Sequence, residues 1–154
     1  TKTDNMYFDG VLKEEVKTYN YQATTSDNLS PLKFEEWYNG KSPYELSNMF
    51  DGKLDTAYRS SGNIKSGDEI IVDLGQEEYI KNIYMLMGRT SEDNMIMNGN
   101  LQISKDGIEW KTTVEGNTFR EVFEDEINEN ARYIKYVATE DQENQLYVKE
   151  IMVN

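Results

Sequence analysis

The absence of two residue types decides which chemistry this chain can perform. Its 154 residues include no His and no Cys. Catalytic triads, proton shuttles and metal sites that need imidazole are therefore excluded. Thiol nucleophiles, disulfides and cysteine-ligated zinc or iron–sulfur sites are excluded as well. What remains is oxygen chemistry from carboxylates, hydroxyls and carbonyls, which suits hard cations such as calcium.

One short run gathers several of these oxygen donors. FDGKLDT at 50–56 contains Asp51, Asp55 and Thr56, and Gly52 permits a sharp bend among them. Calcium takes about 6–8 oxygen ligands, typically a mixture of carboxylates and backbone carbonyls. The run is therefore a candidate calcium loop. The pattern alone leaves open the alternative that Asp51 only closes an Asx-turn.

The net charge restricts the partners. The chain carries 29 acidic and 16 basic residues, a formal net charge of −13, and its pI is about 4.4. Nucleic acids and anionic membrane surfaces both require clustered Lys and Arg, so neither is expected as a partner. No apolar run approaches the ~20 residues of a membrane span, so membrane insertion is not expected either.

The elements that must position the candidate loop are mostly strands. The length fits one domain, and an aromatic content of 12% argues against disorder. Short strand-like stretches follow one another, separated by turn signals such as Asn98-Gly99 and Asp106-Gly107. Without long helices between them, such strands predict an all-β antiparallel sandwich or barrel. The predicted strands cover 16–24, 69–74, 79–87, 100–104, 109–114, 119–123, 132–139 and 147–153.

Two short helical turns are expected between the first and second of these strands. Pro31 opens PLKFEEWYNG at 31–40, which ends on a glycine stop. A second turn, YELSNMF, follows at 44–50. The first 15 residues are polar and aperiodic, so we interpret 1–15 as a lead-in and 16–154 as the folded domain. Because the chain begins at Thr1, we also expect it to be a piece of a longer protein.

Three segments, taken in order, resemble one family. They are NMFDGKLDTAYRS at 48–60, GDEIIVDLG at 67–75 and LQISKDGIEW at 101–110, followed by RYIKYVAT and VKEIMV. The set resembles the discoidin domain, also called the coagulation factor V/VIII type C domain, and most of all the family 32 carbohydrate-binding modules of bacterial glycoside hydrolases. The resemblance covers about 16–154 and implies a discoidin-like jelly roll.

The resemblance also implies a structural calcium ion. In such domains the loop at 50–56 curls round the metal, and an acidic residue near the C-terminus closes the cage. The ligands that it implies are carboxylates and a hydroxyl together with backbone carbonyls. They are the Asp51 and Glu150 carboxylates, the Thr56 hydroxyl and carbonyl, and the carbonyls of Asn48, Lys53 and Lys149. The alternative for Glu150 is an exposed strand residue.

A sugar site at one end of the sandwich is the second implication. Sugars are bound by an aromatic ring against their apolar face and by hydrogen bonds to their hydroxyls, for which the arginine fork is suited. The matching positions are Arg59 and Arg89; Arg89 can instead fasten its own loop through a salt bridge. Further candidate ligand-binding residues are Asn94, Trp37, Tyr38 and Tyr147, and Asn98 is a further candidate hydroxyl contact.

Three aromatic side chains are candidates for the hydrophobic core rather than for ligand binding. Trp37 can pack on the core if Leu32, Phe34 and Trp37 share one helical face. Tyr58 and Trp110 are both expected to pack in the core.

The chain departs from galactose-binding members at the sugar site. It has Arg59 where they often carry His, Gly62 near the place of a Trp, and Gln145 near the place of an aromatic residue. These departures predict either a shift of specificity to another sugar, such as an N-acetylhexosamine, or very weak binding. The expected ligands are terminal galactose-type or N-acetylhexosamine sugars, bound with Kd from ~mM to high µM.

The predicted function is a non-catalytic carbohydrate-binding module that targets an attached glycoside hydrolase to glycans. An extracellular location, secreted or on a bacterial cell surface, is expected with it. The alternative is an adhesion or protein-binding discoidin domain that uses an exposed apolar loop tip, such as MIM at 95–97. Catalysis by the domain itself is not expected, because carboxylate pairs carry little information among 29 acidic residues.

Overall fold

The computed structural model of this protein describes residues 21–33, 42–88 and 96–154. The predicted lead-in at 1–15, the start of the first predicted strand and most of the predicted turn at 31–40 lie outside the described residues. The strands are β1 (Gln22–Thr25), β2 (Tyr58–Asn63), β3 (Glu69–Met87), β4 (Met97–Ser104), β5 (Lys111–Phe119), β6 (Val122–Ala138) and β7 (Gln145–Val153). Two short 3-10 helices, η1 (Asp27–Leu29) and η2 (Leu46–Phe50), lie between β1 and β2.

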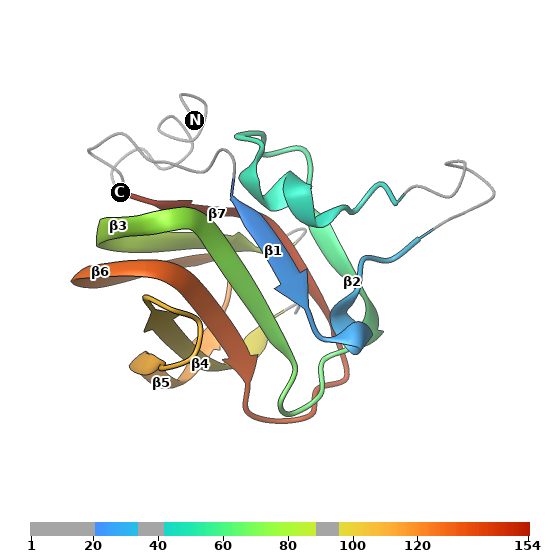
Figure 1. Ribbon diagram of the computed structural model, residues 1–154. Coiled ribbons are helices and arrows are strands. Elements are labelled where there is room, and N and C mark those ends of the chain that lie inside the picture. Colours follow the sequence, from blue (N-terminus) through green and yellow to red (C-terminus); the bar gives the residue numbers. More distant parts are fainter. Residues whose placement is uncertain (1–20, 34–41, 89–95) are drawn as a thin grey trace.

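The two longest strands, β3 and β6, each belong to both layers of the fold. They pair antiparallel along most of their length, and Figure 1 shows their ribbons bending together. The register shifts between Asp73 and Glu78 of β3, on either side of Gly75, whose φ of 88° suits glycine. Such an irregularity bends the strand, so both strands pass from one layer into the other.

The neighbours of β3 and β6 define the two layers. Before the bend, β3 pairs with β1; the matching half of β6 pairs with β4, which carries β5 at its other edge. After the bend, β3 pairs with β7, and β7 pairs with β2. The described strands therefore form one antiparallel sheet, ordered β2-β7-β3-β6-β4-β5 with β1 beside β3, that folds over on itself. The predicted all-β antiparallel sandwich is confirmed.

The core lies between these layers because the strands alternate. In the first half of β3, Ile70, Val72 and Leu74 are buried, whereas Ile71 and Asp73 between them are half-buried. Successive side chains of a strand point to opposite faces, so this pattern places one face inward. The sequence showed this stretch as consecutive apolar residues, and the pairing decides which of them enter the core.

Tyr58 connects the start of β2 to the core. Its side chain is completely buried, and its hydroxyl donates a hydrogen bond to the Leu29 carbonyl oxygen at 2.5 Å. Burial raises the pKa of this phenol, so it stays a neutral donor. The prediction that Tyr58 belongs to the core is confirmed.

Two predicted boundaries are wrong because tertiary pairing overrides local pattern. The strands predicted at 69–74 and 79–87 are one strand, β3, which continues through Gly75. The strand predicted at 119–123 does not exist as a unit. Phe119 ends β5 and Val122 begins β6, so the chain reverses between the layers there. Both apolar ends are used, since Phe119 packs against Phe123 with ring centroids 4.8 Å apart.

The turn predicted at Asn98-Gly99 is also wrong, because both residues lie inside β4. Glycine is required at position 99 because the neighbouring strand leaves no space for a side chain. A Cβ at this position would come within 2.1 Å of the Val137 carbonyl oxygen on β6. Glycine therefore marks a close approach of two strands rather than a reversal of the chain.

Strand β2 was not predicted. Its sequence, YRSSGN, has one large apolar residue and no apolar alternation. Its inward positions include Ser60, which is completely buried and accepts a hydrogen bond from the Leu146 N–H at 2.8 Å. Polar residues that satisfy each other inside a sheet leave no periodic hydrophobic signal.

A smaller apolar cluster covers the outer face of the β7 layer. Tyr84, Leu86 and Met152 are buried there, and Leu54 from the loop after η2 packs against them. The loop that contains the candidate calcium ligands is therefore fixed to the outside of the sheet. In the part of the chain that the structure describes, no helix has the length and apolar character needed to cross a bilayer.

Candidate functional site

Four side chains meet at one end of the sandwich, and we call them the rim cluster: Tyr44, Arg59, Gln145 and Tyr147. Arg59 donates two hydrogen bonds, from Nε at 2.9 Å and from Nη2 at 2.6 Å, to the Gln145 Oε1 atom. Its guanidinium carbon lies 5.9 Å from the centroid of the Tyr44 ring. The Tyr44 and Tyr147 rings meet at 6.2 Å with an interplanar angle of 64°.

Strand pairing explains why these residues meet. Arg59 on β2 lies directly opposite Tyr147 on β7. Gln145 is two residues before Tyr147, so both side chains point to the same face of the strand. The Gln145 amide is held in turn, because its Nε2 donates to the Ser60 carbonyl oxygen at 2.9 Å. The arginine fork is therefore fixed before any ligand arrives.

The cluster has the chemistry that sugar recognition needs. Arginine has five N–H donors, and among the described residues Gln145 accepts from two of the Arg59 donors. Within this part of the chain, three donors therefore stay available for hydroxyl oxygens. The two tyrosine rings add apolar faces beside the fork. None of the four side chains is fully buried or fully exposed, which is typical of a shallow surface site.

Neighbouring segments are tied to the same end. The Leu32 N–H donates to the Arg59 carbonyl oxygen at 2.9 Å, and the Gly88 N–H donates to the Tyr147 carbonyl oxygen at 3.0 Å. The Ile96 carbonyl oxygen accepts from the Asn144 side chain at 2.9 Å. The described residues before 34 and on both sides of 89–95 therefore lie close to the rim cluster.

The structure describes two of the six predicted sugar-site residues. Arg59 and Tyr147 are brought together as strand neighbours. Trp37, Tyr38, Arg89 and Asn94 lie outside the described residues, so their roles stay predictions.

Sequence reasoning missed two members of the rim cluster, Tyr44 and Gln145. The alternation of β7 could have placed Gln145 beside Tyr147, whereas no spacing links Tyr44 to either.

The candidate calcium loop is closed by its own side chains. The Asp51 Oδ1 atom accepts from the Lys53 N–H at 2.9 Å, and the Asp51 Oδ2 atom accepts from the Thr56 hydroxyl at 2.5 Å. The first contact is the Asx-turn that the sequence left open. The Thr56 hydroxyl donates its proton and keeps its oxygen lone pairs, so this turn is compatible with a cation bound by the same loop.

Glu150 is not an exposed strand residue. Its side chain is 0% exposed, and its Oε2 atom accepts from the Gly52 N–H at 2.9 Å. It lies on β7 opposite Leu86, two residues from Met152, so it faces the outer apolar cluster under the loop. A carboxylate buried at this depth requires compensation for its lost hydration.

The structure also shows how two other predicted ligands, Lys149 and Asn48, are held in β7 and η2. Lys149 is the extra residue at the register shift between β3 and β7, because Leu86 and Met87 pair with Glu150 and Val148. Such a bulge turns the backbone groups of the extra residue out of the ladder. The Asn48 side chain donates to the Pro43 and Ala57 carbonyl oxygens at 3.0 and 2.9 Å, which ties the two ends of the loop together.

Carboxylates alone do not form a metal site. Across 21–33, 42–88 and 96–154, no group of three or more Asp or Glu side chains is arranged to hold an ion. A cation at the loop must therefore combine Asp51 and Glu150 with hydroxyl and carbonyl oxygens. This mixed oxygen set is the kind that calcium accepts.

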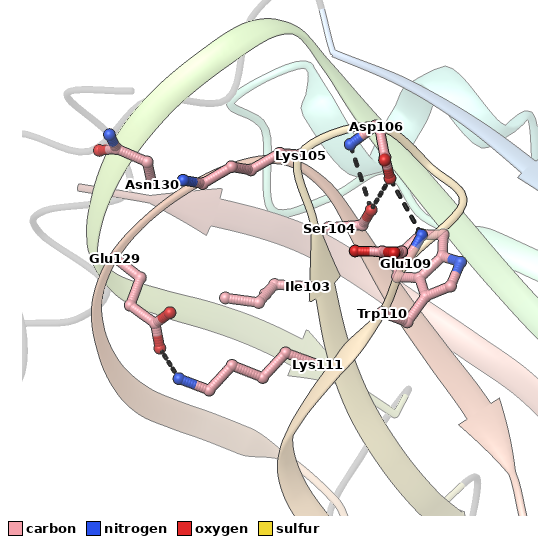
Figure 2. Close-up of a pocket in the computed structure, with 9 residues that line it drawn as sticks. All are labelled: Ile103, Ser104, Lys105, Asp106, Glu109, Trp110, Lys111, Glu129 and Asn130. Carbon is pink, nitrogen blue, oxygen red and sulfur yellow. Dashed lines mark hydrogen bonds and ion pairs between the residues drawn. The ribbon is translucent and has the colours of Figure 1, made fainter.

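A pocket of about 350 Å³ lies near the turn between β4 and β5 (Figure 2). Two of its charged side chains form an ion pair, and backbone N–H groups bind a third. Lys111 pairs with Glu129 across the pocket, and the N–H groups of Glu109 and Ile108 hold the pKa of the Asp106 carboxyl below its usual value. The residues that line it are Ile103, Ser104, Lys105, Asp106, Glu109, Trp110, Lys111, Glu129 and Asn130.

Trp110 does not enter the core as expected. It is half-buried and packs edge-on against Tyr133, with ring centroids 6.4 Å apart, and Lys135 Nζ lies 4.1 Å from its ring centroid. Tyr133 and Lys135 alternate with buried residues of β6, so Trp110 covers the outer face of that strand. The adjacent turn leads the chain outward, and a cation–π contact replaces burial in the core.

Known proteins share both the sequence pattern and the fold. The F5/8 type C domain matches residues 13–150. No curated protein sequence matches the chain.

Among solved structures, the Clostridium perfringens module CpGH89CBM32-5, in complex with GalNAc-β-1,3-galactose, has a TM-score of 0.64 at 20% identity, covering 87% of this chain and 94% of that one. Chitosan-binding module 1 of a Paenibacillus sp. IK-5 chitosanase/glucanase has a TM-score of 0.69 at 19% identity, covering 92% and 99%. The C. perfringens NanJ family 32 module, in complex with galactose, has a TM-score of 0.64 at 16% identity, covering 86% and 92%.

At these low identities, the structural similarity shows a shared fold. The family follows instead from the match of the sequence to the F5/8 type C domain. That match covers most of the chain, including β1 to β6 and the start of β7. The chain belongs to the F5/8 type C domain family.

Proposed function

We propose that this domain is a non-catalytic carbohydrate-binding module. The observation that carries the proposal is the rim cluster, in which Gln145 fixes the Arg59 fork beside the rings of Tyr44 and Tyr147. A preorganised fork loses little side-chain entropy when it meets sugar hydroxyls, and tyrosine rings suit the apolar face of a sugar. Two structures of similar fold are complexes with galactose and with GalNAc-β-1,3-galactose, which supports this ligand class.

The ligands we propose are terminal galactose-type or N-acetylhexosamine sugars. Arg59 offers donors to hydroxyl or carbonyl oxygens, and both sugar types present such oxygens. Arg89, Asn94, Trp37 and Tyr38 are retained as proposed contacts on the basis of the family resemblance. A shallow site for one sugar predicts Kd from ~mM to high µM, which is about −4 to −6 kcal/mol.

A titration panel tests this function. The domain is titrated calorimetrically with galactose, N-acetylgalactosamine and N-acetylglucosamine, with mannitol as a polyol that lacks a ring. We expect saturable binding of at least one sugar in the stated range and none of mannitol. Saturable binding of none of the three sugars, with a glycan array also blank, contradicts the proposal.

The alternative of an adhesion domain uses the loop MIM at 95–97 as an exposed apolar tip, and the structure describes the last two of its residues. Met97 is only 1% exposed and begins β4, and Ile96 is half-buried. In the described part of this segment, Met97 therefore belongs to the core. This leaves glycan binding as the better supported function.

We propose that the loop at 50–56 binds a structural calcium ion. The described residues fit such an ion, because Glu150 supplies a buried carboxylate at Gly52 and Asp51 lies in the same loop beside Thr56. Asn48, Lys53 and Lys149 would add backbone carbonyls. Bound calcium would offset the cost of burying Glu150 and hold the loop on the outer apolar cluster.

We also propose that the domain belongs to a secreted or cell-surface glycoside hydrolase of a bacterium. Carbohydrate-binding modules raise the local concentration of an attached enzyme on its glycan. An antibody raised against the domain is expected to detect a polypeptide larger than 17.9 kDa in the medium or at the cell surface of the source organism. A band of 17.9 kDa confined to the cell interior contradicts this proposal.

A further inference from the structure

A second surface at the end of the sandwich has polar lining and no assigned role. We call it the polar groove; its volume is about 370 Å³, which is within the range of ligand pockets. It forms where the start of β4, the last part of β5 and the end of β6 meet. Its lining consists of Asn98, Gly116, Asn117, Thr118, Thr139 and Glu140.

Asn98 holds the polar groove in one arrangement. Its Nδ2 atom donates to Glu140 Oε1 at 2.6 Å, and its Oδ1 atom accepts from the Thr118 hydroxyl at 2.7 Å. Its carbonyl oxygen accepts from the Thr139 N–H at 3.0 Å. Asn98, which the sequence indicated as a sugar contact, is thus occupied in positioning Thr118 and Glu140.

Other groups of the polar groove are available to a ligand. Glu140 is exposed, and Asn98 engages one of its two carboxylate oxygens. The Asn117 side chain has no hydrogen-bond partner within the described residues, although its backbone pairs with Gly99. A carboxylate oxygen accepts from hydroxyls, and an amide both donates and accepts. These are the contacts that a sugar ring uses when no aromatic platform is present.

Hydrogen bonds connect the polar groove to the rim cluster. The Asn98 N–H donates to Gln142 Oε1 at 2.8 Å, and Gln142 Nε2 donates to Asn144 Oδ1 at 3.0 Å. Asn144 Nδ2 then donates to the carbonyl oxygen of Gln145 at 2.9 Å, and the side chain of Gln145 holds Arg59. Both surfaces are therefore fixed on the same segment, 139–147.

We propose that the polar groove binds a further sugar residue of the glycan whose terminal sugar occupies the rim cluster. The inference rests on the proposed carbohydrate-binding function and narrows its ligand to a neutral oligosaccharide. Glu140 and a net charge of −13 oppose acidic sugars, whereas neutral hydroxyls pair with both Glu140 and Asn117.

The experiment measures how affinity depends on glycan length. Neutral oligosaccharides of one to four residues, sharing the terminal sugar preferred in the panel, are titrated into the domain, and a sialylated or uronic-acid-terminated counterpart is added at each length. Affinity is expected to rise at least about tenfold from the monosaccharide to the length that reaches the groove. In ¹⁵N–¹H spectra, only the longer glycans should shift the amides of Gly116, Asn117 and Thr139.

Two variants and two matched controls separate the groove from the rim. Asn117→Ala and Glu140→Gln should lose the gain from length and keep the affinity for the monosaccharide. Glutamine retains an oxygen for Asn98, so the groove should keep its shape. Asn130→Ala, which lies in β6 at the other pocket, and Glu143→Gln, an exposed residue that does not line the groove, should behave as wild type.

Each result decides the inference. Monosaccharide binding that does not strengthen with length, or a gain that survives both groove variants, overturns the groove and leaves the proposed function standing. Stronger binding of the acidic series overturns the neutral ligand class. Binding of no glycan at any length overturns the groove together with the proposed function.

Discussion

Chelation of calcium is expected to lower the Tm of this domain by about 5–10 °C. At a free calcium concentration ~100 times Kd, binding to the native state contributes about 2.7 kcal/mol. For a domain of this size, 1 kcal/mol corresponds to about 2–4 °C in Tm. Thermal melts followed by circular dichroism, with excess calcium and with a chelator, measure the shift. Equal Tm values in both buffers, together with no metal in the purified protein, would contradict the proposed calcium site.

Glu150→Gln should abolish this calcium response. Glutamine keeps the shape of the side chain and an oxygen for the Gly52 N–H, but it carries no charge for a cation. Because a buried carboxylate is costly without a cation, the variant should melt at or above the wild type in chelator and below it in calcium. A variant that is simply less well packed would instead melt lower in both buffers.

A matched control lies in the same loop. Asp55 is exposed and is not among the predicted ligands, so Asp55→Asn removes one charge from the loop and should retain the full calcium response. If Asp55→Asn and Glu150→Gln lose the response equally, calcium is held by the general charge of the loop. The specific cage proposed around Glu150 would then be wrong.

Arg59→Ala is expected to weaken glycan binding by about tenfold to a hundredfold. Hydrogen bonds from a charged donor contribute about 1.5–3 kcal/mol, and each 1.4 kcal/mol changes Kd by about tenfold. Arg59→Lys keeps the charge and loses the planar fork, so it should recover little of the affinity. Calorimetric titration with the preferred sugar of the panel, supported by melts that confirm folding, measures both effects.

Arg132→Ala is the control for Arg59→Ala. Arg132 also makes two hydrogen bonds to one partner, Asp73, at 2.9 and 3.2 Å, but it lies on the outer face of β6, away from the rim cluster. Its removal should leave sugar affinity unchanged. If Arg59→Ala binds sugar as well as Arg132→Ala does, the rim cluster is not the sugar site.

Local sequence determined most of the strands. β-branched and aromatic residues in short runs, such as 69–74 and 132–139, predicted strands that the structure contains. The missing strand, β2, shows why the rest could not be predicted, because Ser60 is buried through hydrogen bonds rather than through apolarity. The turn wrongly predicted at Gly99 also depends on a distant residue. Glycine is needed there because the Val137 carbonyl oxygen on β6 leaves no space for a Cβ.

The sequence indicated one of the two candidate sites, and the tertiary structure was needed for the other. The loop FDGKLDT is contiguous, so the sequence alone indicated its oxygen donors and, through the family resemblance, Glu150. The rim cluster joins four residues from the loop before η2, from β2 and from β7. Only strand pairing places Arg59 opposite Tyr147, and only the path of the loop before η2 places Tyr44 against both.

By itself, then, the sequence determined the element types, the exclusion of imidazole and thiol chemistry, and the resemblance to the F5/8 type C domain family, because composition and short-range pattern carry that information. Only the tertiary structure decided that Glu150 is buried, that Trp110 lies outside the core, and that Gln145 holds the arginine fork. Each of these depends on which distant strands become neighbours, and pairing energy is shared among residues far apart in the chain.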